Sequence, residues 1–536
     1  MGVTGRPVRW DPQRAADAYA RGLWVRTTLA DPLRAAARHT PDRVLLVDGD
    51  RRLDCRTLHL RAQRLAHALI ARMPPGSVVS VMLPNWHEAA VVYLGATVAG
   101  MVVNPVLPSL RDRELSFILS DVASRMIFVP STFGAHDYMA MLQRITREVD
   151  SPPQVIGVRG GHEPFEALLD EAAPAVGDRA LPLCDPDAVR MILHTSGTSG
   201  RPKGVLHTHN SIHALIRQIR DHWLVEAGDT FLVPSPIAHI GGCIYAFECP
   251  LLLGTTAVLM DRWNADHAVE LMVSHRCTHV AGATPFLAQL LAAARRAGTR
   301  LPDLKLFVCG GASMSPSLIR SAAAYFERAV VTRVYGSTEV PVTTVGAPGD
   351  PDLAADTDGR PGIAEVKLAP HDAAPPGTGE ILARGPQMLL GYLHPEDNSE
   401  SFDRQGYFRT GDLARRLDDG CLVVTGRAKD IIIRGGENIS AAEVEDVLLG
   451  HPGIAEVAVV GLPDPRTGER ACAAVVPTAL PGPDVAELRR FLAEHGVATF
   501  KAPEQVVTLA ELPKNDAGKV LKHRIRAVLT ADQMGG

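Results

Sequence analysis

The chain has 536 residues, of which 46% are hydrophobic and 21% charged, and its formal net charge is -5. This length predicts roughly two to four domains. The slightly negative charge and the aromatic content of only 5% argue against a nucleic-acid-binding protein and against binding to an anionic membrane surface.

Other bulk features favour a cytoplasmic protein. The eight cysteines are scattered and form no Cys-x-x-Cys pair, a distribution typical of reduced core residues. The polar N-terminus lacks the apolar run of a secretory signal. The longest apolar stretch, residues 243–260, contains Glu248, Pro250 and Gly254, which indicates a buried helix and strand rather than a membrane span.

The first third of the chain alternates between helical and strand patterns. Asp31 before Pro32 predicts the N-cap of a helix. Residues 43–48 and 77–83 are expected to be strands, with a helix over 88–99. The same alternation resumes over residues 230–334. This pattern predicts an α/β fold, with parallel sheets covered by helices.

The pattern changes near residue 346. Residues 346–380 are rich in Pro, Gly and Asp and lose helical periodicity, and strands at 380–384 and 422–424 predict a small β-rich subdomain. A strand at 431–433, a capping box at Ser440 and a strand at 454–460 then predict a small α+β domain. We therefore expect an N-terminal domain of residues 1–428 and a C-terminal domain of residues 429–536.

The most informative segment follows an apolar run at residues 189–193. Its glycines let backbone N–H groups turn toward a ligand, and its hydroxyls and one lysine add donors and a positive charge. This set of groups suits a polyphosphate, although the spacing is not that of Walker A. A flexible loop without function is the alternative. The predicted phosphate residues are Thr195, Ser196, Gly197, Thr198, Ser199, Gly200 and Lys203.

Four further segments carry polar groups suited to a nucleotide. Residues 335–339 combine a tyrosine for a nucleobase, hydroxyls for a phosphate and Glu339 for Mg²⁺. Asp412 and Arg427 each follow a turn and can bind a ribose. Lys519, freed by the glycine before it, can reach an anion. Taken singly, each has a structural alternative: an exposed turn, a solvated charge or a basic surface loop.

In this order and spacing, the five segments resemble the adenylate-forming superfamily, which includes acyl- and aryl-CoA synthetases, peptide-synthetase adenylation domains and beetle luciferases. The resemblance extends from about residue 30 to 530 and is strongest to fatty-acyl and cyclohexanecarboxylate-type ligases. It implies that a carboxylate attacks the α-phosphate of ATP, giving acyl-AMP and pyrophosphate, and that a thiol then attacks the acyl-adenylate. ATP, Mg²⁺ and coenzyme A are the implied cofactors and co-substrate.

The resemblance also assigns residues to the nucleoside. Tyr335 corresponds to the residue that stacks on adenine, and residues 311–313 line the other face of the base. Asp412 and Arg427 correspond to the ribose ligands. The full set of ATP-binding residues implied is Thr195, Ser196, Gly197, Thr198, Ser199, Gly200, Lys203, Gly311, Ala312, Ser313, Tyr335, Gly336, Ser337, Thr338, Asp412, Arg427 and Lys519.

At the phosphates, Thr338 corresponds to the contact with the α-phosphate. Glu339 corresponds to the Mg²⁺ partner, with Thr195 as the second residue assigned to the metal. Lys519 corresponds to a lysine that enters for adenylation, where an ammonium offsets the charge gathering on the phosphoryl oxygens.

The mobile C-terminal domain is expected to turn about Lys429. Its rotation withdraws Lys519 and brings Gly435 and Gly436 to the site, where they form a channel for coenzyme A. One site thus serves two half-reactions.

The acyl site is expected around residues 234–243. His239 corresponds to a residue beside the substrate carboxylate, with a buried structural histidine as the alternative. Ile240, Cys243 and Val340 indicate an apolar pocket. Hydroxybenzoate ligases carry asparagine where this chain has Ile240, which argues against a hydroxybenzoate substrate.

These features favour an acyl-CoA ligase for a short-chain, medium-chain or alicyclic acid. No carrier domain follows Lys519 in this sequence. Two alternatives remain: an acyl-AMP ligase that loads a separate carrier protein, and a non-catalytic nucleotide-binding member of the fold. The acid is left open, as is the choice between a monomer and a homodimer.

Overall fold

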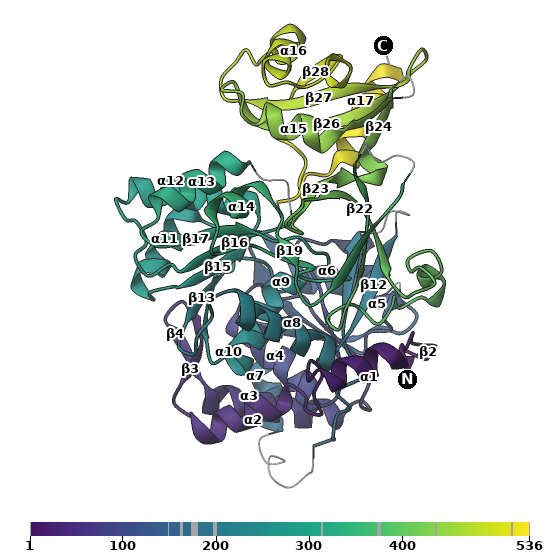
Figure 1. Cartoon of the computed structure of the whole chain (residues 1–536). Coiled ribbons are helices and arrows are strands. Elements are labelled where there is room, and N and C mark those ends of the chain that lie inside the picture. The colour runs from purple at the N-terminus through teal and green to yellow at the C-terminus, as the bar shows by residue number, and fades with distance from the viewer. Residues whose placement is uncertain are drawn as a thin grey trace.

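Two large sheets, a small sheet and a separate C-terminal domain make up the molecule (Figure 1). The α/β class with a β-rich subdomain and a small α+β domain is confirmed. The structure is a computed structural model. It describes residues 2–147, 149–160, 164–172, 181–196, 201–311, 315–371, 377–434, 437–515 and 518–534.

The first large sheet is parallel except for its last pair, β11 and β12. Apolar runs form its central strands because both faces are covered. In spatial order the strands are β10 (Gln154–Val158), β7 (Met126–Pro130), β5 (Val78–Val81), β6 (Val102–Pro105), β11 (Val189–Ser196) and β12 (Pro202–Thr208). Along the chain, these strands alternate with helices. The helices are α3 (Cys55–Ile70), α5 (Asp112–Asp121), α6 (Tyr138–Ile145), α7 (Pro164–Glu171) and α8 (His209–His222).

The second large sheet is parallel except for the pair β3 and β4. In spatial order its strands are β17 (Val330–Arg333), β16 (Leu306–Cys309), β15 (His279–Gly282), β13 (Thr230–Val233), β14 (Thr256–Leu259), β3 (Val44–Asp48) and β4 (Arg51–Asp54). Helices near it are α2 (Ala30–His39), α9 (Ile240–Cys243), the π-helical turn η2 (Ile244–Glu248), α10 (Cys249–Leu252), α11 (Ala265–Ser274), α12 (Thr284–Arg296) and α13 (Pro316–Tyr325).

Helix α4 (His87–Val98) joins the two large sheets. All twelve of its residues are buried, and it contacts strands of both sheets. A helix that is apolar all round belongs between layers rather than at a surface. One large apolar cluster therefore runs through α3, α4 and both sheets.

The small sheet is antiparallel, in the order β20 (Glu365–Ala369), β21 (Gly379–Arg384), β22 (Phe408–Arg416) and β23 (Leu422–Arg427). The N-terminal helix α1 (Pro12–Ala20) contacts the connection between β21 and β22, where Arg14 donates to the Leu389 carbonyl at 3.0 Å. Shorter elements are β1 (Gly2–Val3), β2 (Arg6–Pro7), β8 (Thr132–Phe133), β9 (His136–Asp137), β18 (Thr344–Val345), α14 (Pro351–Asp356), β19 (Arg360–Pro361) and the 3-10 turn η3 (Pro395–Asn398).

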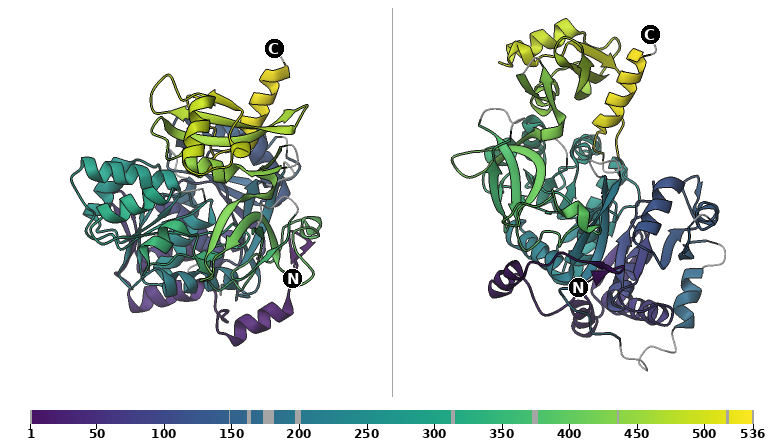
Figure 2. Two further views of the ribbon diagram at one scale, coloured as in Figure 1. Left: turned by 45° about the horizontal axis from the view of Figure 1, so that its top comes forward. Right: turned by 90° about the vertical axis from the view of Figure 1, so that its right-hand side faces the viewer.

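The C-terminal domain stands at one end of the large domain, as two further views show (Figure 2). Its sheet has its own apolar core. The 3-10 turn η4 (Ala428–Asp430) connects the small sheet to it. The elements are β25 (Glu437–Ser440), β24 (Ile431–Arg434), β27 (Gly468–Pro477), β26 (Ile454–Asp464), β28 (Gln505–Thr508), α15 (Ala441–Leu448), α16 (Val485–Glu494), η5 (Thr499–Lys501) and α17 (Lys522–Met534).

Two expectations about local structure are wrong. Helix α2 begins at Ala30 with Leu29 as its N-cap, and Asp31 lies in the first turn, where it accepts from the Thr28 amide at 2.8 Å. A carboxylate in the first turn also favours the helix dipole, so Asp31 signals the start of the helix without capping it. Helix α14 lies within the segment predicted to be irregular, because Asp350 caps its six residues.

Within the ranges given above, no helix combines the length and the apolar character needed to cross a membrane. All eight cysteines are free thiols, and all but Cys184 are buried.

Candidate active site

The predicted phosphate segment is the end of a hairpin. Thr195 of β11 pairs with Lys203 of β12, and Ser196 pairs with Pro202. The predicted loop is therefore shorter than expected, since these four residues lie in strands. Gly197, Thr198, Ser199 and Gly200 lie outside the described residues.

Two cations flank this hairpin and share one carboxylate. The Lys203 ammonium lies 3.5 Å from one oxygen of Asp397 in η3, and Arg201 lies 2.9 Å from the other oxygen. Lys203 also lies 5.0 Å from the ring centroid of Tyr392. Arg201 also lies 3.9 Å from Glu396, so these two cations face two carboxylates of η3.

The segment after β17 makes a tight turn toward the hairpin. A methyl group at Gly336 would lie 2.5 Å from the Val342 amide nitrogen, so the close approach requires glycine. Ser337 closes the turn by accepting from the Val340 amide at 3.2 Å. The turn brings Glu339 to the hairpin, where Thr195 donates to its carboxylate at 3.5 Å.

His207, which was not among the predicted site residues, forms a hydrogen bond to the backbone of this turn. His207 Nε2 donates to the carbonyl of Thr338 at 2.8 Å, and its Nδ1 lies 3.1 Å from the Ser211 hydroxyl. Burial lowers the pKa of His207 to about 4, so the ring is neutral at pH 7. His207 directly precedes Thr208, which forms the capping box of α8 with Ser211.

The Glu339 carboxylate has a second hydroxyl neighbour. Tyr392 donates to Oε1 of Glu339 at 3.0 Å, and the Leu389 amide donates to the Glu339 carbonyl at 2.7 Å. In the described part of the chain, Glu339 is in no ion pair. One unpaired carboxylate beside the Thr195 hydroxyl is an oxygen donor set suited to Mg²⁺.

Tyr335, Asp412 and Arg427 form one connected group. Asp412 and Arg427 face each other across β22 and β23, and Arg427 Nε lies 2.8 Å from an Asp412 oxygen. The Tyr335 hydroxyl donates to the other oxygen at 2.7 Å. Burial and then Asp412 raise the pKa of Tyr335 well above its usual value, so it is a neutral donor. Gly311 has a φ of 85°, whereas Ala312 and Ser313 lie outside the described residues.

Lys519 reaches this group from the C-terminal domain. Asn515 closes the loop by accepting from the Lys519 amide at 2.8 Å, and a methyl group at Gly518 would lie 3.6 Å from Pro285 of α12. More than a third of the Lys519 surface stays open, but the protein surrounds the rest of the side chain. Desolvation and then Arg427 lower the pKa of Lys519 to about 8 against the opposing effect of Asp412.

The structure places His239 at the start of a short helix. It is the N-cap of α9, and the chain turns so tightly there that a methyl group at Gly242 would lie 2.0 Å from the Pro236 carbonyl oxygen. His239 Nε2 is buried and has no hydrogen-bond partner among the described residues. Burial lowers the pKa of His239, so the ring is neutral. A buried nitrogen without a partner marks a place where a ligand can supply one.

Two of the three residues predicted to line the apolar pocket lie in one apolar cluster, and the third lies in another. Cys243 belongs to the large apolar cluster and Ile240 packs against it, whereas Val340 belongs to a cluster with Val205, Met388 and Tyr392. Burial raises the pKa of Cys243 to about 12, which makes the thiol unreactive. Val342 packs against the same cluster as Ile240 with a φ of 47°, a conformation that no sequence signal predicts for a β-branched residue.

Two other predicted positions lie in the C-terminal region. Lys429 lies in η4, between the last pair of β22–β23 and the first pair of β24–β25. Gly435 and Gly436 lie outside the described residues.

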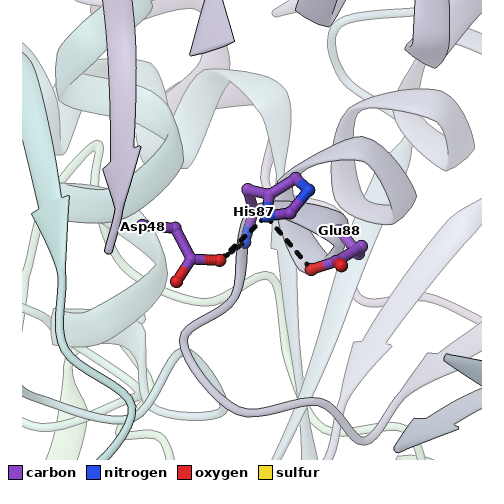
Figure 3. A group of neighbouring side chains, drawn as sticks. All are labelled: Asp48, His87 and Glu88. Carbon is purple, nitrogen blue, oxygen red and sulfur yellow. Dashed lines mark hydrogen bonds and ion pairs between the residues drawn. The ribbon is translucent and has the colours of Figure 1, made fainter. Parts of the chain in front are cut away.

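A separate polar cluster at the start of α4 resembles a metal site (Figure 3). His87 Nδ1 lies 2.8 Å from Asp48 and 3.3 Å from Glu88. The guanidinium of Arg159, however, donates to Glu88 at 2.8 Å and also to Asp48, and it lies over the Trp86 ring. Because Arg159 already supplies the cation, the cluster is an ion-pair network between the large sheets.

Known proteins and protein families match nearly the whole chain. The family model described as AMP-binding enzyme matches residues 33–393, and that of the AMP-binding enzyme C-terminal domain matches residues 443–519. A medium-chain fatty-acid–CoA ligase of Escherichia coli (strain K12) is 34% identical over 544 residues, covering 96% of this chain and 93% of the relative.

Two further comparisons agree with this match. The salicyl-AMP ligase / salicyl-S-ArCP synthetase of Mycobacterium tuberculosis (strain ATCC 25618 / H37Rv) is also 34% identical, covering 98% of this chain and 94% of the relative. The crystal structure of ATP-bound MatB from Rhodopseudomonas palustris superposes with a TM-score of 0.84 at 25% identity, covering 94% of this chain and 99% of the other.

Proposed function

This chain belongs to the AMP-binding enzyme family, and from that membership we propose that it activates a short-chain, medium-chain or alicyclic carboxylic acid and transfers the acyl group to coenzyme A. It is an AMP-forming acid–thiol ligase. The similarity to a medium-chain fatty-acid–CoA ligase supports the choice of acid, as does the apolar Ile240 beside His239.

One observation carries the proposal: two domains bring Lys519 and the Tyr335–Asp412–Arg427 group together. Asp412 and Arg427 would hold the ribose hydroxyls, and the ring of Tyr335 would stack on the adenine. Gly311, with its left-handed backbone, would let the chain pass close to the other face of the base.

Lys519 would act on the phosphates. With a pKa of about 8 it is mostly protonated at pH 7, and a bound polyphosphate favours the charged form further. Its ammonium and that of Lys203 would offset the negative charge that develops when the substrate carboxylate attacks the α-phosphate. Thr338 would orient the same phosphate.

Glu339 and Thr195 would hold Mg²⁺, which would screen the phosphate charges during the attack. His239 would pair its free Nε2 with the substrate carboxylate and so place it for the attack. With these two assignments, the phosphates would lie beside Glu339 and Thr195, and the attacking carboxylate would lie beside His239.

The second half-reaction requires the acyl-adenylate to meet a thiol. We assign the hinge to Lys429 and the domain boundary to residues 428 and 429, where η4 links two separate sheets. Rotation there would withdraw Lys519 and bring Gly435 and Gly436 to the site as part of the coenzyme A channel.

A second candidate is transfer of the acyl group to a carrier protein. The similarity to a protein named salicyl-AMP ligase / salicyl-S-ArCP synthetase favours it. A non-catalytic role is disfavoured, because the chain retains Thr338, Glu339 and Lys519 together.

The test is pyrophosphate release with ATP and Mg²⁺ over a panel of acids from acetate to long-chain acids, with cyclohexanecarboxylate, benzoate and salicylate. We expect release with a short, medium or alicyclic acid, and formation of its CoA thioester. Release without any CoA thioester would favour the carrier-protein candidate, and no release with any acid would contradict both.

The role of Lys519 can be tested with the same assays. Lys519→Ala should abolish adenylation but spare thioester formation from supplied acyl-AMP. The control is Lys514→Ala, because Lys514 lies in the same loop but pairs with Glu456 at 2.6 Å on the surface. Equal loss of both half-reactions in Lys519→Ala would contradict the assignment.

A further inference from the structure

Tyr392 contacts both the Glu339 carboxylate and the Lys203 ammonium, the two charged groups that would lie beside the phosphates of ATP. We propose that Tyr392 is a positioning residue, which orients Glu339 toward the metal and phosphates while it holds Lys203 apart from that carboxylate. The inference rests on the proposed function, because it gives Tyr392 a role in binding ATP with Mg²⁺.

The first contact fixes the carboxylate. The Tyr392 hydroxyl donates to Oε1 of Glu339 at 3.0 Å, and Thr195 donates to the same oxygen at 3.5 Å. In the described residues, no group donates to Oε2. Two donors on one oxygen set the orientation of the carboxylate and leave its second oxygen open to a ligand.

The second contact fixes the ammonium. Lys203 Nζ lies 5.0 Å from the centroid of the Tyr392 ring, within the range of a cation–π interaction. Asp397 holds the same ammonium at 3.5 Å. Lys203 is thereby held beside the site without pairing with Glu339.

A neutral aromatic residue suits this position for an electrostatic reason. Tyr392 is 5% exposed, and a tyrosine hydroxyl carries no charge at neutral pH. It therefore attracts a carboxylate through the hydroxyl and a cation through the ring without neutralising either. A charged residue there would pair with one of them and repel the other.

The backbone holds Tyr392 firmly in this place. Its amide donates to the Asn398 side chain at 2.9 Å, and it forms a bridge with Val205 of β12. Three residues earlier, the Leu389 amide binds the Glu339 carbonyl at 2.7 Å. The segment that carries Tyr392 thus contacts the hairpin and the turn that carries Glu339.

The consequence is a specific defect in Tyr392→Phe. Without the hydroxyl, Glu339 loses a donor and can turn toward Lys203, so that its carboxylate and the ammonium partly neutralise each other. ATP binding should then require more Mg²⁺. Binding of AMP, which lacks the β- and γ-phosphates, should change little.

The experiment measures ATP and AMP affinity by calorimetry over a series of Mg²⁺ concentrations. For Tyr392→Phe we expect the Mg²⁺ concentration that gives half-maximal ATP affinity to rise on the order of tenfold, as the loss of one hydrogen bond to a charged group predicts. AMP affinity should stay within about twofold, since the nucleoside contacts are intact.

The chain offers a matched control in Tyr407. Its hydroxyl donates to Glu365 at 2.9 Å and Lys367 lies 3.8 Å from its ring centroid, so its contacts are of the same kind but lie on the small sheet. Tyr407→Phe should leave the Mg²⁺ dependence of ATP binding unchanged. Tyr392→Leu, which also removes the ring, should weaken ATP binding beyond the phenylalanine variant and again spare AMP.

The outcomes separate the two proposals. Equal weakening of ATP and AMP in Tyr392→Phe, or no change in either, would overturn the role of Tyr392 while the proposed function stands. If the wild type binds no ATP at any Mg²⁺ concentration, the proposed function fails first. Should Tyr392→Leu not fold, the phenylalanine variant still decides, because it keeps the buried ring.

Discussion

At the scale of single residues, the environment of Lys519 matters most. Burial has the largest effect and disfavours the charged ammonium, as do the charges of Arg427 and Lys429, whereas Asp412 favours it. The balance puts the pKa at about 8 instead of its ordinary value of 10.5. The residue thus changes protonation within the range where the enzyme can be assayed.

The pH dependence of adenylation follows from this value. Only the protonated lysine offsets phosphoryl charge, so kcat/KM for ATP should fall as the pH rises through about 8, approaching a tenfold loss per pH unit. Pyrophosphate release at saturating acid measures it. An arginine stays protonated throughout this pH range, so in Lys519→Arg the fall of kcat/KM above about pH 8 should disappear. If the fall is unchanged in this variant, another group causes it.

Residue identity was predictable where a motif carries it and not elsewhere. Asp412 and Tyr335 stand in recognisable segments, and the structure brings them within 2.7 Å of each other. Tyr392 and His207 were missed because their contacts join residues 53 and 131 positions apart. No local pattern records such a pairing, so only the fold reveals these two side chains.

At the scale of elements, strands were easier to predict than their pairing. Apolar runs such as Val78–Val81 identify buried strands because both faces are covered. Residues 195–203 were predicted as one loop after the apolar run 189–193, because a sequence rich in glycine and hydroxyl residues carries no signal for the pairing of Thr195 with Lys203. Helix α14 was not predicted, because six residues are too few to show a helical periodicity of apolar positions.

The segment that leads to the proposed acyl site is held by a single buried side chain. Asn85 is buried and joins the large sheets: its amide group donates to the carbonyls of Val233 and Ser235 at 3.0 and 2.9 Å and accepts from the Ile237 amide at 3.0 Å. These bonds set the path of the segment that leads to His239.

Asn85→Ala should therefore impair the acid site selectively. Three backbone groups lose their partner, so we expect a loss of about 3 kcal/mol in the free energy of unfolding and an increase in KM for the acid on the order of tenfold, with KM for ATP little changed. Denaturant unfolding and steady-state kinetics measure these effects.

A matched variant separates local positioning from general destabilisation. Asn104 is equally buried but binds Ile192 at 2.9 Å in the strand that leads to Thr195. Asn104→Ala should destabilise the fold similarly and leave KM for the acid unchanged. If both variants raise that KM alike, Asn85 has no selective role.

At the scale of the whole molecule, the proposed site draws on both domains. The large domain would supply Glu339, Asp412 and Arg427, and the small one would supply Lys519 through a loop that approaches α12 (Figure 1). Between them, η4 is the short connection that joins the small sheet to the C-terminal sheet. A change of backbone angles over these few residues would reorient the whole C-terminal domain.

Lys429→Pro tests this hinge. Proline fixes φ at about -65° and restricts the preceding residue, so the domain should lose its freedom to rotate. The arrangement described here places Lys519 beside Asp412 and Arg427, so adenylation should persist, whereas thioester formation from supplied acyl-AMP should fall by more than about tenfold. Lys429→Ala removes the same side chain without fixing the backbone and should keep both half-reactions. Undiminished thioester formation in the proline variant would mean that the domain turns elsewhere or does not need to turn.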